Sequence, residues 1–123
     1  MIMDNIRQIV FHKTYFWEFY NSVNSKVQEK IDFVLEILAT QHRVPTNHVK
    51  FIENSDGIYE IRVSVRTDEY RILFFFEEGS LIEGGKIVIL GNGFIKKDKK
   101  DYKKAVSKAE YIKKEYFEEK KNS

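Results

Sequence analysis

Residues 57–76 read GIYEIRVSVRTDEYRILFFF, and this stretch decides the fold that we expect. The segments on either side of RTDE are rich in β-branched and aromatic residues, and RTDE itself has the polar composition of a hairpin turn. Successive side chains of a strand point to opposite faces. One face of the first strand would be apolar: Tyr59, Ile61, Val63 and Val65. The other would be polar: Glu60, Arg62, Ser64 and Arg66.

The register of this hairpin follows from which side chains must be buried. With Arg66 opposite Glu69, Ser64 would face Arg71, and Arg62 and Arg71 would be diagonal neighbours. This register places the aromatic residues of the second strand on the apolar face, whereas a slip by one residue would bury Arg71. The hairpin therefore predicts one apolar face and one face that carries three arginines.

The arginine face has two interpretations. Arg62 and Arg71 can simply pair with Glu60 and Glu69 across the sheet. Alternatively, the planar guanidinium suits phosphate, and the chain contains 16 lysines but only five arginines, three of them on this face. The pair Lys96 and Lys97, which follows the next predicted strand, would then close one side of a phosphate site.

The segments around the hairpin complete an α+β fold. IRQIVF at 6–11 predicts a first strand, and residues 15–23 and 25–40 predict a helical hairpin that packs on one face of the sheet. The polar stretch 41–57 is interpreted as a connection. KIVILG at 86–91 predicts a third strand of an antiparallel meander, and the segment after Asp101 predicts a C-terminal helix. The expected order is β-α-α-β-β-β-α in a single domain, 1–123.

Three residues are candidate helix caps. Thr14 precedes the first helix, Ser25 and Gln28 have the spacing of a capping box for the second, and Asp101 precedes the apolar stripe of the last. We therefore expect the three helices to begin at these positions.

Charge is unevenly distributed along the chain. After Phe94 there are eleven lysines and six acidic residues, an excess of five positive charges, so the preceding residues carry a net charge of −3. Such asymmetry is typical of a segment that meets a polyanion, although lysine-rich terminal helices also serve as plain solubilising surface. The absence of cysteine and of any long apolar run favours a cytoplasmic protein without a membrane partner.

The chain shows no motif for a metal or a cofactor. His12, His42 and His48 lack the mutual spacing of a metal site, and Gly91-Asn92-Gly93 is not part of a nucleotide-binding fingerprint. We expect no metal and no cofactor.

Several of these motifs together resemble a known family. Gly57–Arg62, Glu69–Ile72 with the aromatic run to Phe76, Gly93–Lys97 and Ala109–Tyr116 are similar to the Gp49-like branch of the RelE/HigB toxins of toxin–antitoxin modules. The resemblance implies an endoribonuclease that cleaves mRNA, on the ribosome or free, without a metal. It also implies a partner antitoxin with a helix-turn-helix domain. In this family the 2′-hydroxyl of the RNA is the nucleophile, which leaves a 2′,3′-cyclic phosphate and a 5′-hydroxyl.

The resemblance also implies roles for individual residues. Arg71 matches the arginine held against the scissile phosphate, and Arg62 matches a basic position on the neighbouring strand. Lys96 and Lys97 match the basic residues that would stabilise the phosphate or the leaving group. Glu60 is a candidate general base, or it orients the arginine. Further RNA contacts are expected from other basic residues near the site: Arg66, Lys99 and Lys100.

The start of the last helix departs from the family pattern, because Asp101-Tyr102 stands where most relatives have Thr-Pro. Tyr102 would stack on a base or donate a proton, but its place on the apolar stripe favours a core role. Two other functions remain open within the same fold. One is binding of DNA gyrase without RNA cleavage, and the other is a degenerate toxin that only pairs with its antitoxin and represses transcription.

Overall fold

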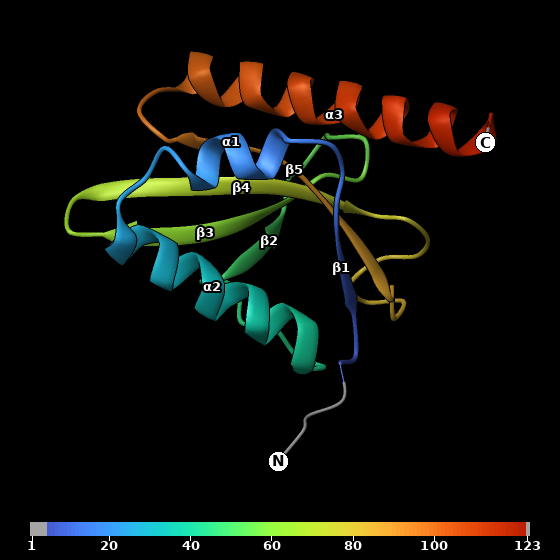
Figure 1. Ribbon diagram of the computed structural model, residues 1–123, viewed down its shortest axis with the longest axis horizontal. Helices are drawn as coiled ribbons and strands as arrows, with labels where there is room; N and C mark the ends of the chain where they lie inside the picture. The colour runs from blue at the N-terminus through green and yellow to red at the C-terminus, as the bar shows by residue number, and fades with distance from the viewer. Residues whose placement is uncertain (1–4, 123) are drawn as a thin grey trace.

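The computed structural model describes residues 5–122, which form a five-stranded sheet with helices on both faces (Figure 1). The strands are β1 Gln8–Phe11, β2 Val49–Phe51, β3 Tyr59–Val65, β4 Asp68–Phe76 and β5 Ile87–Ile95. The helices are α1 Tyr15–Tyr20, α2 Ser25–Thr40 and α3 Lys99–Lys121. The sheet order is β1-β5-β4-β3-β2, with β1 parallel to β5 and the other neighbours antiparallel. The expected α+β class is confirmed.

Strand β2 is the element that the sequence did not predict. It lies within the polar stretch 41–57 that was interpreted as a connection, and that interpretation is wrong for Val49–Phe51. Val49 pairs with Ile61 and Phe51 with Tyr59, so β2 adds an edge strand beside β3. A three-residue strand shows too few alternations for a sequence pattern, and its conformation depends on pairing with its neighbour.

The β3–β4 hairpin has the predicted faces but a different register. Arg62 lies directly opposite Arg71, not diagonal to it, and Val65 lies opposite Asp68. The turn is therefore formed by Arg66 and Thr67, one residue earlier than expected, and Arg66 has a φ of +57°. Moving the turn by one residue shifts the pairing by two, which leaves every side chain on its predicted face. The burial pattern could not separate these two registers.

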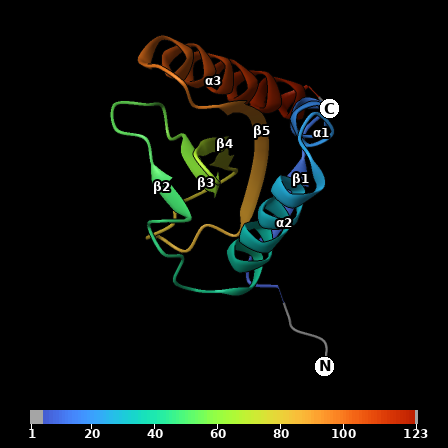
Figure 2. The same cartoon turned by 90° about the vertical axis from the view of Figure 1, so that its left-hand side faces the viewer.

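The apolar face of the hairpin forms the larger of two core clusters, with α1 and α2 packed against it (Figure 2). This cluster contains the hairpin residues predicted to be buried: Tyr59, Ile61, Val63, Val65, Tyr70, Ile72, Phe74 and Phe76. Helix α3 covers the opposite face, where Leu73, Phe75 and Ile89 meet Ala109 and Ile112. Both faces are therefore covered over much of the sheet, and the polar side chains of β3 and β4 lie beside the start of α3.

Two of the three expected helix caps are displaced. Helix α2 is capped by Asn24, whose side chain accepts a hydrogen bond from the Val27 amide at 3.1 Å, so Ser25 is not the cap. Helix α3 is capped by Asp98, which accepts from the Asp101 amide at 2.9 Å. Thr14 does precede α1, but its side chain makes no capping hydrogen bond. The cap of α3 therefore lies three residues before Asp101, the residue that was expected to cap this helix.

Strand β5 packs tightly under α1 at Gly93. A β-carbon at this position would lie 2.3 Å from the ring of Phe19. The pairing of β5 with β4 also shifts register between Ile72 and Phe74. Glycine therefore allows α1 to approach the sheet at this point.

The second half of α3 is attached to the β1–α1 region by a polar cluster around Glu115. Its Oε1 lies 3.1 Å from His12 Nε2, 3.2 Å from Lys13 Nζ and 3.0 Å from the Tyr15 hydroxyl. None of the helices within residues 5–122 is long and apolar enough to cross a membrane.

Candidate functional site

A buried carboxylate, Glu60 of β3, is the centre of the candidate site. The residue is only 5% exposed, and it lies where the polar sides of β3 and β4 meet the first turns of α3. Its Oε2 lies 3.4 Å from Arg71 Nε, and its Oε1 lies 3.9 Å from Arg62 Nε. Two arginines from adjacent strands therefore share one carboxylate, which offsets the cost of burying its charge.

Tyr102 of α3 completes the contact from the opposite side. Its hydroxyl donates a hydrogen bond to Glu60 Oε2 at 2.9 Å. Burial, followed by the hydrogen bond to Glu60 and the charge of that carboxylate, raises the pKa of Tyr102 to about 12. The hydroxyl is thus protonated at neutral pH and is a donor, never a base.

Arg71 is enclosed at the bottom of this arrangement. The residue is 2% exposed, its Nη1 donates to the Tyr70 carbonyl at 3.0 Å and its Nη2 donates to Glu69 Oε1 at 3.2 Å. Its Nε has no hydrogen-bond partner among residues 5–122. A hydrogen bond from Ser64 and those from Arg71 lower the pKa of Glu69. Arg71 therefore acts on two neighbouring carboxylates, and in this conformation its guanidinium does not reach the surface.

Arg62 lies at the mouth of the site. Its side chain is 32% exposed, and Nη1 donates to the Thr46 carbonyl at 3.3 Å. It lines a pocket of about 510 Å³ between β2, β3 and the start of α3. The cations that line this pocket outnumber the carboxylates by six to two: Lys50, Arg62, Lys96, Lys97, Lys99 and Lys103, against Glu60 and Asp98.

Three of the five lysines, Lys96, Lys97 and Lys99, were predicted from the sequence, but Lys50 and Lys103 were not. Lys50 lies on β2 opposite Glu60, so it was overlooked together with its strand. Lys103 lies one turn after Lys99 on α3, a helical spacing that could have identified it. Lys96 Nζ lies 5.7 Å from the centre of the Tyr102 ring. No carboxylate forms an ion pair with any of these lysines within the described part of the chain, so their charges face the pocket and solvent.

The structure brings most of the predicted residues together. Glu60, Arg62, Lys96, Lys97, Lys99 and Tyr102 line the same pocket. Arg71 contacts the pocket through Glu60 but does not line it. Arg66 is exposed at the tip of the hairpin, and Lys100 is exposed on α3 without lining the pocket. The pocket therefore offers a dense positive field above a buried carboxylate and a hydroxyl donor, an arrangement that suits a phosphodiester.

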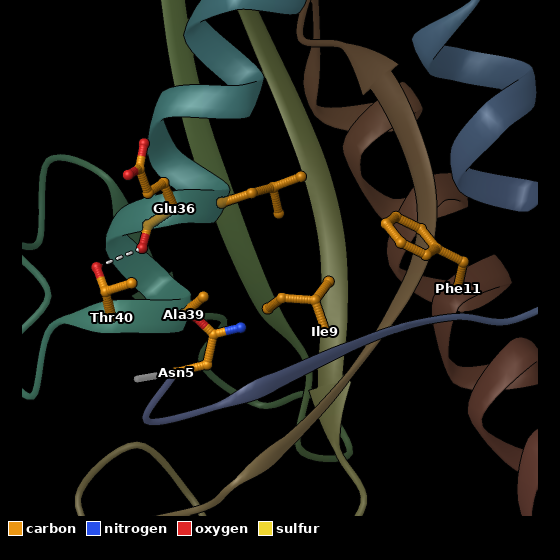
Figure 3. Close-up of a pocket in the computed structure, with 7 residues that line it drawn as sticks. Asn5, Ile9, Phe11, Glu36, Ala39 and Thr40 are labelled. Atoms are coloured by element: carbon orange, nitrogen blue, oxygen red, sulfur yellow. Dashed lines mark hydrogen bonds between the residues drawn. The ribbon is translucent and has the colours of Figure 1, made fainter. Parts of the chain in front are cut away.

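A second groove lies between β1 and the end of α2, and Figure 3 shows its lining. Ile9 points from β1 toward Ala39, whereas the Phe11 ring lies beside Phe16 and Trp17 of α1. The Thr40 hydroxyl donates to the Glu36 carbonyl at 2.7 Å. Among the described residues that line this groove there is one carboxylate, Glu36, and no cation. It therefore lacks the charge that the Glu60 pocket has for a polyanion.

The chain was compared with family models, with curated proteins and with solved structures. The model of the family described as phage derived protein Gp49-like (DUF891) matches residues 18–114. No curated protein and no solved structure matches the chain. The matched segment contains every residue that lines the Glu60 pocket, and it covers more than half of the chain. The resemblance seen in the motifs is therefore confirmed, and the chain belongs to the Gp49-like family of RelE/HigB-like toxins.

Proposed function

We propose that this chain is the toxin of a toxin–antitoxin pair and that it is an endoribonuclease that cleaves mRNA at the Glu60 pocket. The observation that carries the proposal is the set of six cations that surround a buried carboxylate and a protonated tyrosine hydroxyl. Family membership supports the toxin and its antitoxin partner. Cleavage, the ribosome as the setting, and a helix-turn-helix domain in the antitoxin are parts of the proposal.

The reaction uses the RNA's own 2′-hydroxyl. Glu60 accepts the 2′-proton, and the 2′-oxygen attacks the adjacent phosphorus while the bond to the 5′-oxygen breaks. Arg62 and the neighbouring lysines stabilise the negative charge that grows on the phosphorane. An ammonium group, from Lys96 or Lys97, supplies a proton to the departing 5′-oxygen. The products are a 2′,3′-cyclic phosphate and a 5′-hydroxyl, and the mechanism requires no metal.

Arg71 and Tyr102 have supporting roles in this scheme. Both contact Glu60 Oε2, so they fix the orientation of the carboxylate from below and from the side of α3. Arg71 is therefore a positioning residue. The resemblance assigned it a direct phosphate contact, and such a contact would require a rearrangement that exposes the guanidinium, which is buried in this structure.

The decisive measurement is cleavage of a defined mRNA in a translation extract. We expect the wild-type protein to produce discrete fragments with 5′-hydroxyl ends. Arg62→Ala should lower the cleavage rate by about a hundredfold, because it removes one cation from the developing charge. Arg43→Ala is the matched control, since Arg43 is exposed and lies outside the pocket. Uncut mRNA with wild-type protein, or equal rates for the two variants, would contradict the proposal.

A further inference from the structure

Another pocket, which we call the Phe33 pocket, adjoins the Glu60 pocket on the other side of Arg62. It has a volume of about 390 Å³ and lies between α2 and β3. Arg62 lines both pockets, so a ligand held by its guanidinium at one site can extend directly into the other. The backbone fixes this junction, because the Arg62 amide donates to the His48 carbonyl at 2.7 Å.

The Phe33 pocket contains an exposed aromatic ring, that of Phe33, which belongs to neither core cluster. Phe33 is 56% exposed, whereas the large apolar residues on the inward side of α2, such as Ile31 and Leu38, are fully buried. The His48 ring lies 5.9 Å from it at an interplanar angle of 79°, so one flank of Phe33 is supported while much of the ring remains open. An open aromatic face beside a polar rim suits stacking of a planar ring.

The charges of this pocket favour an anionic ligand. Lys30 and Arg62 are its cations, and there is no carboxylate among the described residues that line it. Lys30 Nζ donates to the Ser64 carbonyl at 2.8 Å, which holds the ammonium group over β3 with further donors available. The Asn47 side chain at the rim can both donate and accept hydrogen bonds, as recognition of a base edge requires.

From this geometry we propose that the pocket binds a nucleobase of the RNA that flanks the phosphate held at Arg62. The base stacks on Phe33, with His48 along one side and Asn47 at its edge. This inference rests on the proposed function, because it names the part of the RNA that the same site recognises next to the cleaved bond. It assigns base selection to α2 and to the turn before β2, while the chemistry belongs to β3 and α3. A protein partner is disfavoured because two cations and one open ring offer little apolar surface.

Binding of oligonucleotides with and without bases tests the proposal. The probes are a single-stranded 2′-O-methyl RNA, which cannot be cleaved through its 2′-oxygen, and an abasic strand with the same number of phosphates. Full-length wild-type protein should prefer the base-containing strand by about tenfold or more, the usual effect of one stacked base. Phe33→Ala should abolish most of that preference, and Phe33→Trp should retain it.

Phe51→Ala is the control, because Phe51 is also a partly exposed aromatic residue and lines neither pocket. It should keep the wild-type preference. If wild-type protein binds both strands equally, the base site is wrong although the phosphate site stands. If it binds neither strand, both the base site and the proposed function fail. If Phe33→Ala keeps the base preference, the base does not stack on Phe33 and the proposal is overturned.

Discussion

Tyr102 connects the candidate site to α3 through a single hydrogen bond to Glu60. Tyr102 lies on the apolar stripe of α3 and is partly buried against the core cluster under that helix. Its hydroxyl also reaches the Glu60 pocket. The core interpretation and the site interpretation of this tyrosine therefore do not exclude one another.

At the same scale, the titration of Tyr102 is a testable consequence. Its pKa in the folded protein is about 12, against a usual value of 10.0, because burial and the contact with Glu60 favour the neutral hydroxyl. The stabilisation from this hydroxyl should be complete below pH 10 and should be lost as the pH rises toward 12. The difference in tyrosinate absorbance between wild type and Tyr102→Phe should have its midpoint near pH 12. Tyr111→Phe, which alters an exposed tyrosine, is the control, and a Tyr102 midpoint near 10 would contradict the contact with Glu60.

Single residues of the site were partly predictable from the sequence. Strand alternation placed Glu60 and Arg62 on one face, and chain order placed Lys96 and Lys97 beside them. The burial of Arg71 was not predictable, because it depends on how α3 covers that face, and alternation within a hairpin carries no information about a distant helix. Lys50 was hidden for the same kind of reason, since its position depends on a pairing between β2 and β3.

Among the elements, β5 limits how α1 packs on the sheet. Replacing Gly93 with alanine would place a β-carbon against the ring of Phe19, and the strand and helix would have to separate. We expect Gly93→Ala to lower the free energy of unfolding by about 1–3 kcal/mol, as is usual for an overpacked core. Chemical denaturation measures this change.

A double-mutant comparison separates this contact from the intrinsic effect of alanine. Truncating the ring by Phe19→Ala opens the space above β5, so adding Gly93→Ala to that background should cost less than it does in the wild type. An equal cost in both backgrounds would show that Phe19 does not restrict position 93.

The elements themselves were predictable where their patterns were long. Helix α2 and the β3–β4 hairpin show many periods of their spacing, and their buried faces agree with the structure. The errors lie at short or terminal features. Strand β2 has three residues, and the caps of α2 and α3 moved to Asn24 and Asp98 because several polar residues near each helix start can serve as caps.

At the scale of the whole molecule, α3 forms a wall of the site at one end and is attached to the β1–α1 region at the other. The attachment depends on Glu115. Burial tends to raise the pKa of this carboxyl group, but hydrogen bonds from Tyr15, Lys13 and His12 outweigh that effect and lower it. The charged form of Glu115 is therefore the form that holds the helix.

The attachment should weaken in acid. A carboxyl group whose pKa is lowered by folding contributes stability above its unfolded value, near 4.5, and that contribution is lost as the pH falls through the folded value. The melting temperature of wild type should therefore fall more steeply below pH 4.5 than that of Glu115→Gln. Glu53→Gln, a change at an exposed residue, should follow the wild-type curve. Parallel curves for wild type and Glu115→Gln would contradict this role.

Only the complete fold shows which lysines of the positively charged C-terminal segment meet at one place. Four lysines of the C-terminal segment, Lys96, Lys97, Lys99 and Lys103, line the Glu60 pocket, and Lys50 joins them from the more acidic N-terminal part. Composition indicated a positive segment but not which of its lysines meet at one place. That selection depends on how the start of α3 lies beside β2 and β3, which no local pattern specifies.

Arg66 has a consequence for engineering this protein. It is the first residue of a two-residue hairpin turn and has a φ of +57°, where a residue with a β-carbon loses about 1–2 kcal/mol relative to its ordinary conformation. Glycine or asparagine adopts that conformation more readily. Local backbone preference therefore does not account for arginine at the tip of this hairpin. This turn is therefore the first position to change in a design that aims to raise the stability of the fold and leave both pockets intact. Relief of the strained backbone is local, and Arg66 lines neither pocket.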